Sequence, residues 1–564
     1  MSLLNKKANQ DDHIDQISDL PCNVIDGILE KLNIRDLVRT SILSTKWRYK
    51  WTYVPKLVFG MNFFEPYEDL DDPEVEPVVS KIITDVLTLH NGPIYNFCLL
   101  IPMGINFKTT AEHFDIWVPL LSRRGIKQFK LLDFETALSH LPYIVFSCKE
   151  LTEFYLFGFN LSIPPNFSGF KKLLDLTLES VTFRESSALE SLISGCPLLE
   201  KLRIEYCNGF EYFDFSAPTL KVLVLKFHRN VKSICLKKAK NLIDLTLVTS
   251  GGWKSCLIKS LPKNIQRFSI GSCYFNNETP YADIIPPTLV KSSFDSIKYL
   301  KLDGVKLNER RELLYIVNVL NSAPRLVELV IQSFIHVDIT QAPDRSEELE
   351  CSSCCLNQLQ TVNICICGNS RQHAMSLIRF ILANSTSLKT LTFEVRFGSQ
   401  ELDAPMLLSI SQDLLLMKRV SQSAQELNYF KYSRFNLSIP PNFSGFKRLL
   451  NLEFDDVTFE SGALGNLTSG CPLLEKLRIE YCNGFEYFHI SAPTLKVLYL
   501  HLDRNVKSSC LKKAKNLIDL TIIPDNSKIS GLIKSLPKIQ RFTIGPYYGV
   551  QTQEVRFWPH LFVW

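Results

Sequence analysis

The chain has 564 residues, of which 46% are hydrophobic and 21% charged, a composition typical of folded proteins. Its net charge is +5 at pH 7 and basic residues form no long runs, so it lacks the strongly basic surface of a nucleic-acid-binding protein. Residues 1–16 contain no apolar stretch typical of a secretory signal, and no apolar run approaches the roughly 18 residues of a transmembrane helix. We therefore expect localisation in the cytoplasm and/or nucleus, reduced cysteines, and no nucleic-acid or membrane partner.

Residues 1–16 are predicted to be disordered, and the first domain is expected over residues 17–60. Pro21 suits the first turn of a helix because it has no N–H group to leave unbonded there. We expect Asn33 to cap a second helix and Ser44 to cap a third. Three short helices bury too little surface for an independent core, so a partner is expected to cover their apolar face. Apolar residues of the first helix recur at helical spacing at Val24, Ile25, Ile28, Leu29 and Leu32.

The block from Ile17 to Trp51 resembles the F-box, and the match extends in order over the whole block. The F-box docks on the Skp adaptor of cullin–RING ubiquitin ligases, so the resemblance implies the Skp adaptor as a partner and, through it, cullin and RING subunits. The alternative is an ordinary helical cap on a larger domain. The residues that the resemblance assigns to the docking surface, or to holding its helices in place, are Leu20, Pro21, Ile25, Ile28, Leu29, Ile34, Leu37, Val38, Leu43, Trp47 and Trp51.

Residues 61–90 are expected to form an acidic linker followed by a helix. Acidic side chains and prolines dominate residues 61–77, which favours a solvated connection; an acidic interaction site is the alternative. The acidic residues are Glu65, Glu68, Asp69, Asp71, Asp72, Glu74 and Glu76.

Residues 91–350 carry a repeated pattern in which an apolar residue is followed by two more at the third and fifth positions after it. Examples are Leu151, Phe154 and Leu156, and the pattern recurs every 21 to 26 residues as far as Ile265. This period fits leucine-rich repeats, in which each repeat adds one parallel strand and a helix or loop to a solenoid. A β-sandwich is the alternative, but its turns recur every 8–12 residues.

The residues between the buried strand positions are expected to face the concave sheet, the surface that solenoids use for binding. We interpret this face as a site for a protein substrate; a solvated sheet face without a binding role is the alternative for each residue. The candidate substrate-binding residues are Lys201, Arg203, Asp244, Arg267, Tyr299 and Lys301.

A cysteine cluster could suggest a zinc site, but its spacing favours packing. Structural zinc sites need well-spaced Cys or His pairs. Cys365 and Cys367 alternate with isoleucines in a predicted strand, so both are expected on one face of it. The other members are Cys351, Cys354 and Cys355. We predict no bound metal and no cofactor.

Residues 351–397 resemble the FBD domain, on the evidence of an early Leu–x–x–Val–x–Ile strand, a helix that ends in FILANS and a closing strand at Leu388–Thr392. An F-box, repeats and this region together resemble the plant F-box/FBD/LRR class. The resemblance implies an α/β fold: a small three-helix F-box followed by a leucine-rich-repeat solenoid, with the parallel sheet on the concave side and helices and loops outside. Residues 398–426 resemble a linker and the ordinary chain end of that class.

Residues 427–546 are predicted to hold duplicated repeats. Residues 160–171 recur unchanged as 436–447, and residues 194–213 recur as 469–488. Substituted positions include Val224, which becomes Tyr499. The duplicate is either a longer binding surface with two related patches or a segment without a selected role. Residues 547–564 are expected to form an irregular tail.

No catalytic motif occurs: the chain has no phosphate-binding G-x-x-x-x-G-K-[ST], no H-E-x-x-H and no G-x-S-x-G. The family resemblance implies a non-catalytic, substrate-recognition subunit of an SCF-type ubiquitin ligase. One alternative is an F-box paralogue that delivers no substrate, or a repeat scaffold outside the ligase. Another is an enzyme or a receptor for a small molecule.

Overall fold

The computed structural model describes residues 17–544 except for several gaps, the longest being 250–257, 273–292, 334–355, 397–428 and 525–538. The predictions for residues 1–16, 398–426 and 547–564 therefore lie outside the described residues. The chain divides into two compact units, one ending at Ile265 and the other beginning at Gln266, and each is described by itself.

The N-terminal block contains two short α-helices, α1 (Cys22–Leu29) and α2 (Ile34–Arg39). The expected third α-helix after Ser44 does not form; the chain instead makes the 3-10 helices η1 (Thr40–Ile42) and η2 (Lys50–Tyr53), with turns between them. Aromatic and β-branched residues dominate this segment and have low helix propensity, which accounts for the difference. Trp47 and Trp51 are nevertheless buried, as a packed block requires.

The predicted acidic linker is partly folded. It begins with α3 (Met61–Phe64), and α4 (Val75–Leu89) follows. Phe63 and Phe64 of α3 are only 3% and 2% exposed, and the ring centroids of Phe63 and Phe59 lie 5.1 Å apart in an edge-to-face arrangement. The expectation of a solvated connection is therefore wrong for α3, because its two phenylalanines join the apolar core.

The main sheet of the first unit contains one strand from each repeat, and each strand pairs in parallel with the next along the chain. Alternate residues of each strand are buried, so the apolar pairs of the sequence pattern line the core. Each repeat thus covers the apolar face of its neighbour, as the repeat period predicts. The strands are β1 (Lys56–Phe59), β2 (Asn96–Ile101), β3 (Gln128–Asp133), β5 (Glu153–Phe157), β7 (Asp175–Glu179), β9 (Lys201–Glu205), β11 (Val222–Phe227) and β13 (Asp244–Thr249).

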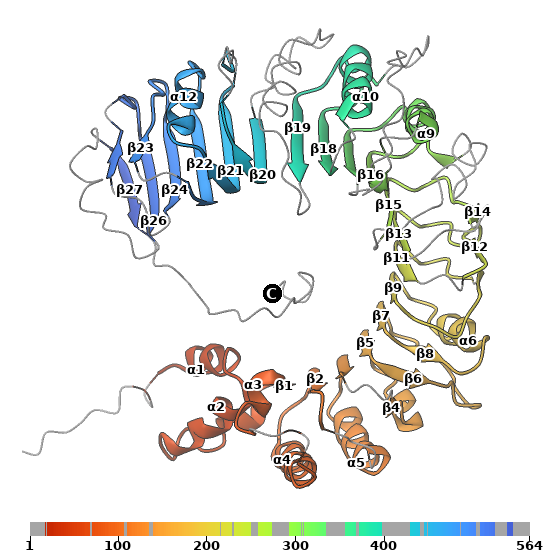
Figure 1. Ribbon diagram of the computed structural model, residues 1–564. Coiled ribbons are helices and arrows are strands. Elements are labelled where there is room, and N and C mark those ends of the chain that lie inside the picture. Colours follow the sequence, from red (N-terminus) through yellow and green to blue (C-terminus); the bar gives the residue numbers. More distant parts are fainter. Residues whose placement is uncertain are drawn as a thin grey trace, which may run out of the picture. The chain divides into compact units, whose positions relative to one another are not determined.

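Helices and short strands cover the other side of this core (Figure 1). Two small parallel sheets there consist of β4 (Ser139–His140), β6 (Phe159–Leu161) and β8 (Thr182–Phe183), and of β10 (Tyr212–Asp214), β12 (Ser233–Cys235) and β14 (Ile258–Ser260). The helices are α5 (Thr110–Arg123), η3 (Tyr143–Ser147) and α6 (Ala188–Ser194). We call the sheet face opposite these elements the open face.

The second unit repeats this plan. Its strands β15 (Arg267–Ser272), β16 (Tyr299–Val305), β17 (Glu328–Ser333), β18 (Thr361–Cys367) and β19 (Thr390–Arg396) pair in parallel and in chain order. Helices α9 (Arg310–Asn321) and α10 (Arg371–Asn384) lie on one side of them (Figure 1). The FBD-like region thus contributes two strands of the sheet and, between them, the helix α10.

The duplicated segment continues this sheet. β20 (Tyr429–Leu437) pairs in parallel with β19, and β21 (Asn451–Phe459), β22 (Lys476–Cys482), β24 (Val497–Leu502), β26 (Asp519–Pro524) and β27 (Arg541–Ile544) follow in order. Outside the sheet lie α12 (Ala463–Ser469) and a parallel pair, β23 (Tyr487–His489) and β25 (Ser508–Cys510). In the described part of the chain, every helix is too short or too polar to cross a lipid bilayer.

Candidate functional site

The N-terminal block has a buried apolar interior. Six of the eleven sequence-predicted docking residues form this interior, with at most 5% of each side chain exposed: Ile25, Leu29, Ile34, Leu37, Trp47 and Trp51. Because they are withdrawn from the surface, these six hold the helices together and are not available to touch a partner.

The other predicted residues lie at or near the surface. Ile28 is 40% and Leu43 is 53% exposed, Pro21 is exposed, and Leu20 and Val38 are half-buried. The structure adds two side chains that sequence reasoning did not assign to docking, Ile42 at 86% exposure and Val24 at 40%. We call the residues Pro21, Val24, Ile28, Ile42 and Leu43 the exposed apolar set.

The spacing of apolar residues in the sequence indicates part of the exposed apolar set. α1 carries two apolar pairs at i,i+4 spacing, Val24 with Ile28 and Ile25 with Leu29. Only the second pair is buried in the block, whereas Val24 and Ile28 are each 40% exposed to solvent. Ile42 gave no such signal; it is the last residue of η1, which directly follows α2.

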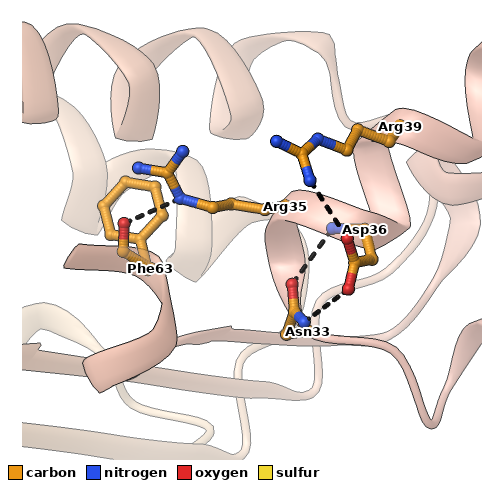
Figure 2. A network of polar contacts seen from close by, with 5 residues as sticks. All are labelled: Asn33, Arg35, Asp36, Arg39 and Phe63. Carbon is orange, nitrogen blue, oxygen red and sulfur yellow. Dashed lines mark hydrogen bonds and ion pairs between the residues drawn. The ribbon is translucent and has the colours of Figure 1, made fainter. Parts of the chain in front are cut away.

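Polar contacts fix the start of α2 and join it to α3 (Figure 2). The Asp36 N–H donates to Asn33 Oδ1 at 3.0 Å, which caps the helix as the sequence predicts. Arg35 Nε donates to the Phe63 carbonyl oxygen at 2.8 Å, and its guanidinium lies 5.3 Å from the Phe63 ring centroid. Arg35 therefore connects the N-terminal block to the segment that leads into the repeats.

A second connection joins η2 to the first repeat. The buried His90 ring places Nε2 at 3.0 Å from the Val54 carbonyl oxygen, and burial lowers the pKa of this histidine. The N–H groups of Asn91 and Gly92 both donate to the Thr52 carbonyl oxygen at 2.9 Å. The strand β1 follows this segment directly and pairs with β2 in the main sheet. Together, these hydrogen bonds and this strand pairing fix the block against the repeats of the first unit.

The predicted substrate residues fall into two groups, one in each unit. Lys201 and Arg203 lie on β9 and Asp244 on β13, all at outward positions of the open face; Lys201 and Arg203 are exposed, and Asp244 is partly buried. In the second unit, the Arg267 guanidinium stacks 4.0 Å above the ring centroid of Tyr299. The sixth residue, Lys301, forms an ion pair with Asp303 at 3.1 Å.

The open face of the first unit also holds a polar cluster that sequence reasoning missed. Tyr155 donates its hydroxyl to Glu179 Oε2 at 2.7 Å, and Lys226 Nζ pairs with Glu205 Oε2 at 2.7 Å. Burial raises the pKa of the Glu179 carboxyl and that of the Tyr155 hydroxyl. These residues occupy outward strand positions beside the predicted ones. Each pair joins two neighbouring strands, β5 with β7 and β9 with β11, and the sequence does not show these pairings.

The second copy rearranges the corresponding contacts. Glu480, which matches Glu205, accepts from Arg478 Nη2 at 2.6 Å, because the lysine partner of the first copy is replaced by His501. The Arg478 guanidinium stacks 4.2 Å above the Tyr499 ring centroid, where the first copy has Val224. Two near-identical sequences therefore present different open faces.

Among the described residues, no group of three or more His, Cys, Asp or Glu side chains has an arrangement that could hold a metal ion. Cys365 is buried in β18, in line with packing. Cys351, Cys354 and Cys355 lie outside the described residues, as does the side chain of Cys367.

Comparisons with known proteins agree with this architecture. The family model "FBD-associated F-box protein At5g56370, LRR repeats" matches residues 114–331 and 394–540, an FBD model matches 350–393, and an F-box domain model matches 17–59. F-box/FBD/LRR-repeat protein At1g13570 of Arabidopsis thaliana is 31% identical over 434 residues, which are 73% of this chain and 98% of that protein. The chain belongs to the F-box/FBD/LRR-repeat family.

Two further Arabidopsis thaliana relatives align over similar lengths. F-box/FBD/LRR-repeat protein At2g04230 is 25% identical over 69% of this chain and 91% of its own length. FBD-associated F-box protein At1g66310 is 27% identical over 74% of this chain and 97% of its own length. The F-box and repeats of this family support a general adaptor role in ubiquitin ligation, and its members are generally non-catalytic.

Proposed function

We propose that this protein is the substrate-recognition subunit of an SCF-type (Skp–cullin–F-box) ubiquitin-protein ligase, acting in the cytoplasm and/or nucleus. The exposed apolar set carries the proposal. It includes Ile42, Leu43 and Ile28, at 86%, 53% and 40% exposure, on a small block whose interior consists of six buried apolar residues. Exposed apolar side chains on a small folded block are typical of a protein-docking surface.

Docking on the Skp adaptor would bury the exposed apolar set in a groove of the partner. Each large aliphatic side chain contributes about 1.5–3 kcal/mol when it is fully withdrawn from water, before the cost of association is subtracted. The six interior residues and Arg35 would act indirectly, by holding the set in one arrangement.

The open face of the repeats is the proposed surface for a protein substrate. Arginine and tyrosine are enriched among the residues that contribute most of the binding energy at protein interfaces. The stacked pair Arg267 and Tyr299 is therefore the strongest candidate for substrate binding among the predicted residues. Lys201, Arg203 and Asp244 would contribute charge complementarity, as would Lys301.

No catalytic side chain is needed for this role. A receptor that holds the substrate beside a ubiquitin carrier supplied by other subunits raises the effective concentration of the two reactants. The connections of Arg35 and His90 in the first unit suit this task, because they fix the docking block against the first repeats.

Direct binding to a purified Skp-type adaptor tests the proposal. The double variant Ile28→Ala/Ile42→Ala is expected to lose at least about tenfold in affinity, since each truncation removes about 1 kcal/mol or more of buried surface. Leu89→Ala is the matched control, because Leu89 is 59% exposed but lies on α4, outside the block. A wild-type chain that is folded yet does not bind the adaptor would instead support a repeat scaffold outside the ligase.

A further inference from the structure

The second copy contains a pocket of about 370 Å³ beside α12 and β23, on the side of the core away from the open face. This volume lies within the range of small-molecule sites. Its lining includes the buried Phe459 and Leu464, and polar side chains surround them: Glu460, Asn466, Ser469, His489, Ser491 and Lys513.

The two copies differ at residues that line the pocket. Gly465 lies where the first copy has Glu190, so a long side chain is missing from the lining. His489 replaces Asp214, the carboxylate that pairs with Lys238 at 3.6 Å in the first copy. Lys513, the equivalent of Lys238, is kept. The second copy thus has glycine in place of a glutamate at the pocket and lacks the carboxylate that pairs with the lysine in the first copy.

The pocket presents charges of both signs. Glu460 and Lys513 both line it, but within the described part of the chain neither belongs to an ion pair, with each other or with another residue. Glu460 matches Glu185 of the first copy, so the carboxylate is kept. A pocket with an apolar lining, a carboxylate and an ammonium group complements a ligand that carries an amino group, a carboxylate and an apolar body.

We propose that this pocket binds a free α-amino acid with an apolar side chain. Lys513 receives the ligand carboxylate, with the Ser491 and Asn466 side chains as further hydrogen-bonding groups, and Glu460 receives its ammonium group. The site is distinct from both the exposed apolar set and the open face, so adaptor binding and substrate binding do not depend on it.

Calorimetry on the full chain with a panel of free amino acids tests the proposal. For an amino acid that binds, two analogues are compared, one lacking the carboxylate and one lacking the amino group; for leucine these are 3-methylbutylamine and 4-methylpentanoate. Each analogue is expected to bind at least about tenfold more weakly, because it leaves one charged group of the pocket unpaired. Absence of binding by every amino acid, or equal binding of the acid analogue, would overturn the proposal.

Two substitutions locate the site, and the one at Gly465 introduces the residue that the first copy has at that position. Gly465→Glu is expected to fill the pocket and abolish binding, while Glu460→Arg is expected to repel the ammonium group. A Cβ on Gly465 comes no nearer than 3.4 Å to the His489 carbonyl oxygen, so the first substitution fits without a clash. The matched control, Glu190→Gly in the first copy, is expected to leave binding unchanged. Binding that survives Gly465→Glu in a chain with wild-type circular dichroism would refute this location.

Discussion

Replacing Gly209 by alanine is expected to damage the first unit far more than the same change at Gly125. Both glycines have positive φ, +91° at Gly209 and +80° at Gly125, where an L-residue costs about 1–2 kcal/mol. At Gly125 nothing lies within 4 Å of an added Cβ, so we expect only this conformational cost. At Gly209 the added Cβ would lie 2.0 Å from the Phe183 carbonyl oxygen.

Relief of that clash requires a backbone movement beside β8. The neighbouring residue Asn208 donates its N–H to the Val181 carbonyl oxygen at 2.9 Å and accepts from the Phe183 N–H at 2.9 Å. Each lost bond costs about 1 kcal/mol. Together with the conformational cost, we expect Gly209→Ala to destabilise this repeat by about 3–4 kcal/mol.

Hydrogen exchange followed by mass spectrometry is the suitable assay, because it reports the opening free energy of each segment in a chain with two units. Faster exchange is expected around residues 181–213 in Gly209→Ala, with little change in the second unit. The second copy offers a replicate, since a Cβ on Gly484 would lie 2.1 Å from the Phe459 carbonyl oxygen. Equal effects of Gly209→Ala and Gly125→Ala would refute the argument from the clash.

Three further predictions concern single side chains. Arg35→Ala is expected to destabilise the N-terminal block by about 1.5–3 kcal/mol, measured by hydrogen exchange, because a charged hydrogen bond is lost. The control Arg39→Ala removes only an exposed ion pair and should cost under about 1 kcal/mol. Equal effects of the two substitutions would contradict this prediction. Burial raises the folded-state pKa of Glu179, so its ionisation destabilises the fold as pH rises through that pKa. Glu179→Gln should therefore melt above wild type at neutral pH, with the gain shrinking below the usual glutamate range, and a gain independent of pH would count against it. Iodoacetamide should label the exposed Cys22 first and Cys207 only on unfolding, because burial raises the pKa of the Cys207 thiol to about 12; early labelling of Cys207 in mass spectrometry would contradict its burial.

The repeat fold could be predicted from the sequence because its signal is local and recurs. Each triplet, such as Leu173, Leu176 and Leu178, places two residues on one strand face, and the strand β7 follows from that spacing alone. The same argument holds for the FBD-like region, where the predicted strand, helix and strand correspond to β18, α10 and β19.

The candidate site was only partly predictable. Periodicity places Ile28 and Leu29 on a helix but does not decide which side is covered, since both sides of α1 are apolar. Ile42 is 86% exposed at the end of η1, directly after α2, and weak propensities spread over several residues do not fix such a boundary. The hydrogen bond between Tyr155 and Glu179 depends on which outward side chains of neighbouring strands are close enough to interact. The sequence of one chain does not show these distances.

The central claim, that the N-terminal block docks on a ligase adaptor, is tested most directly by co-purification of the full chain with the Skp adaptor and cullin. The wild-type chain is compared with Leu20→Ala/Pro21→Ala, which alters one edge of the block and leaves the six interior residues intact. We predict capture of both partners by the wild type and loss of both in the variant. A folded wild-type chain that captures neither partner would contradict the claim.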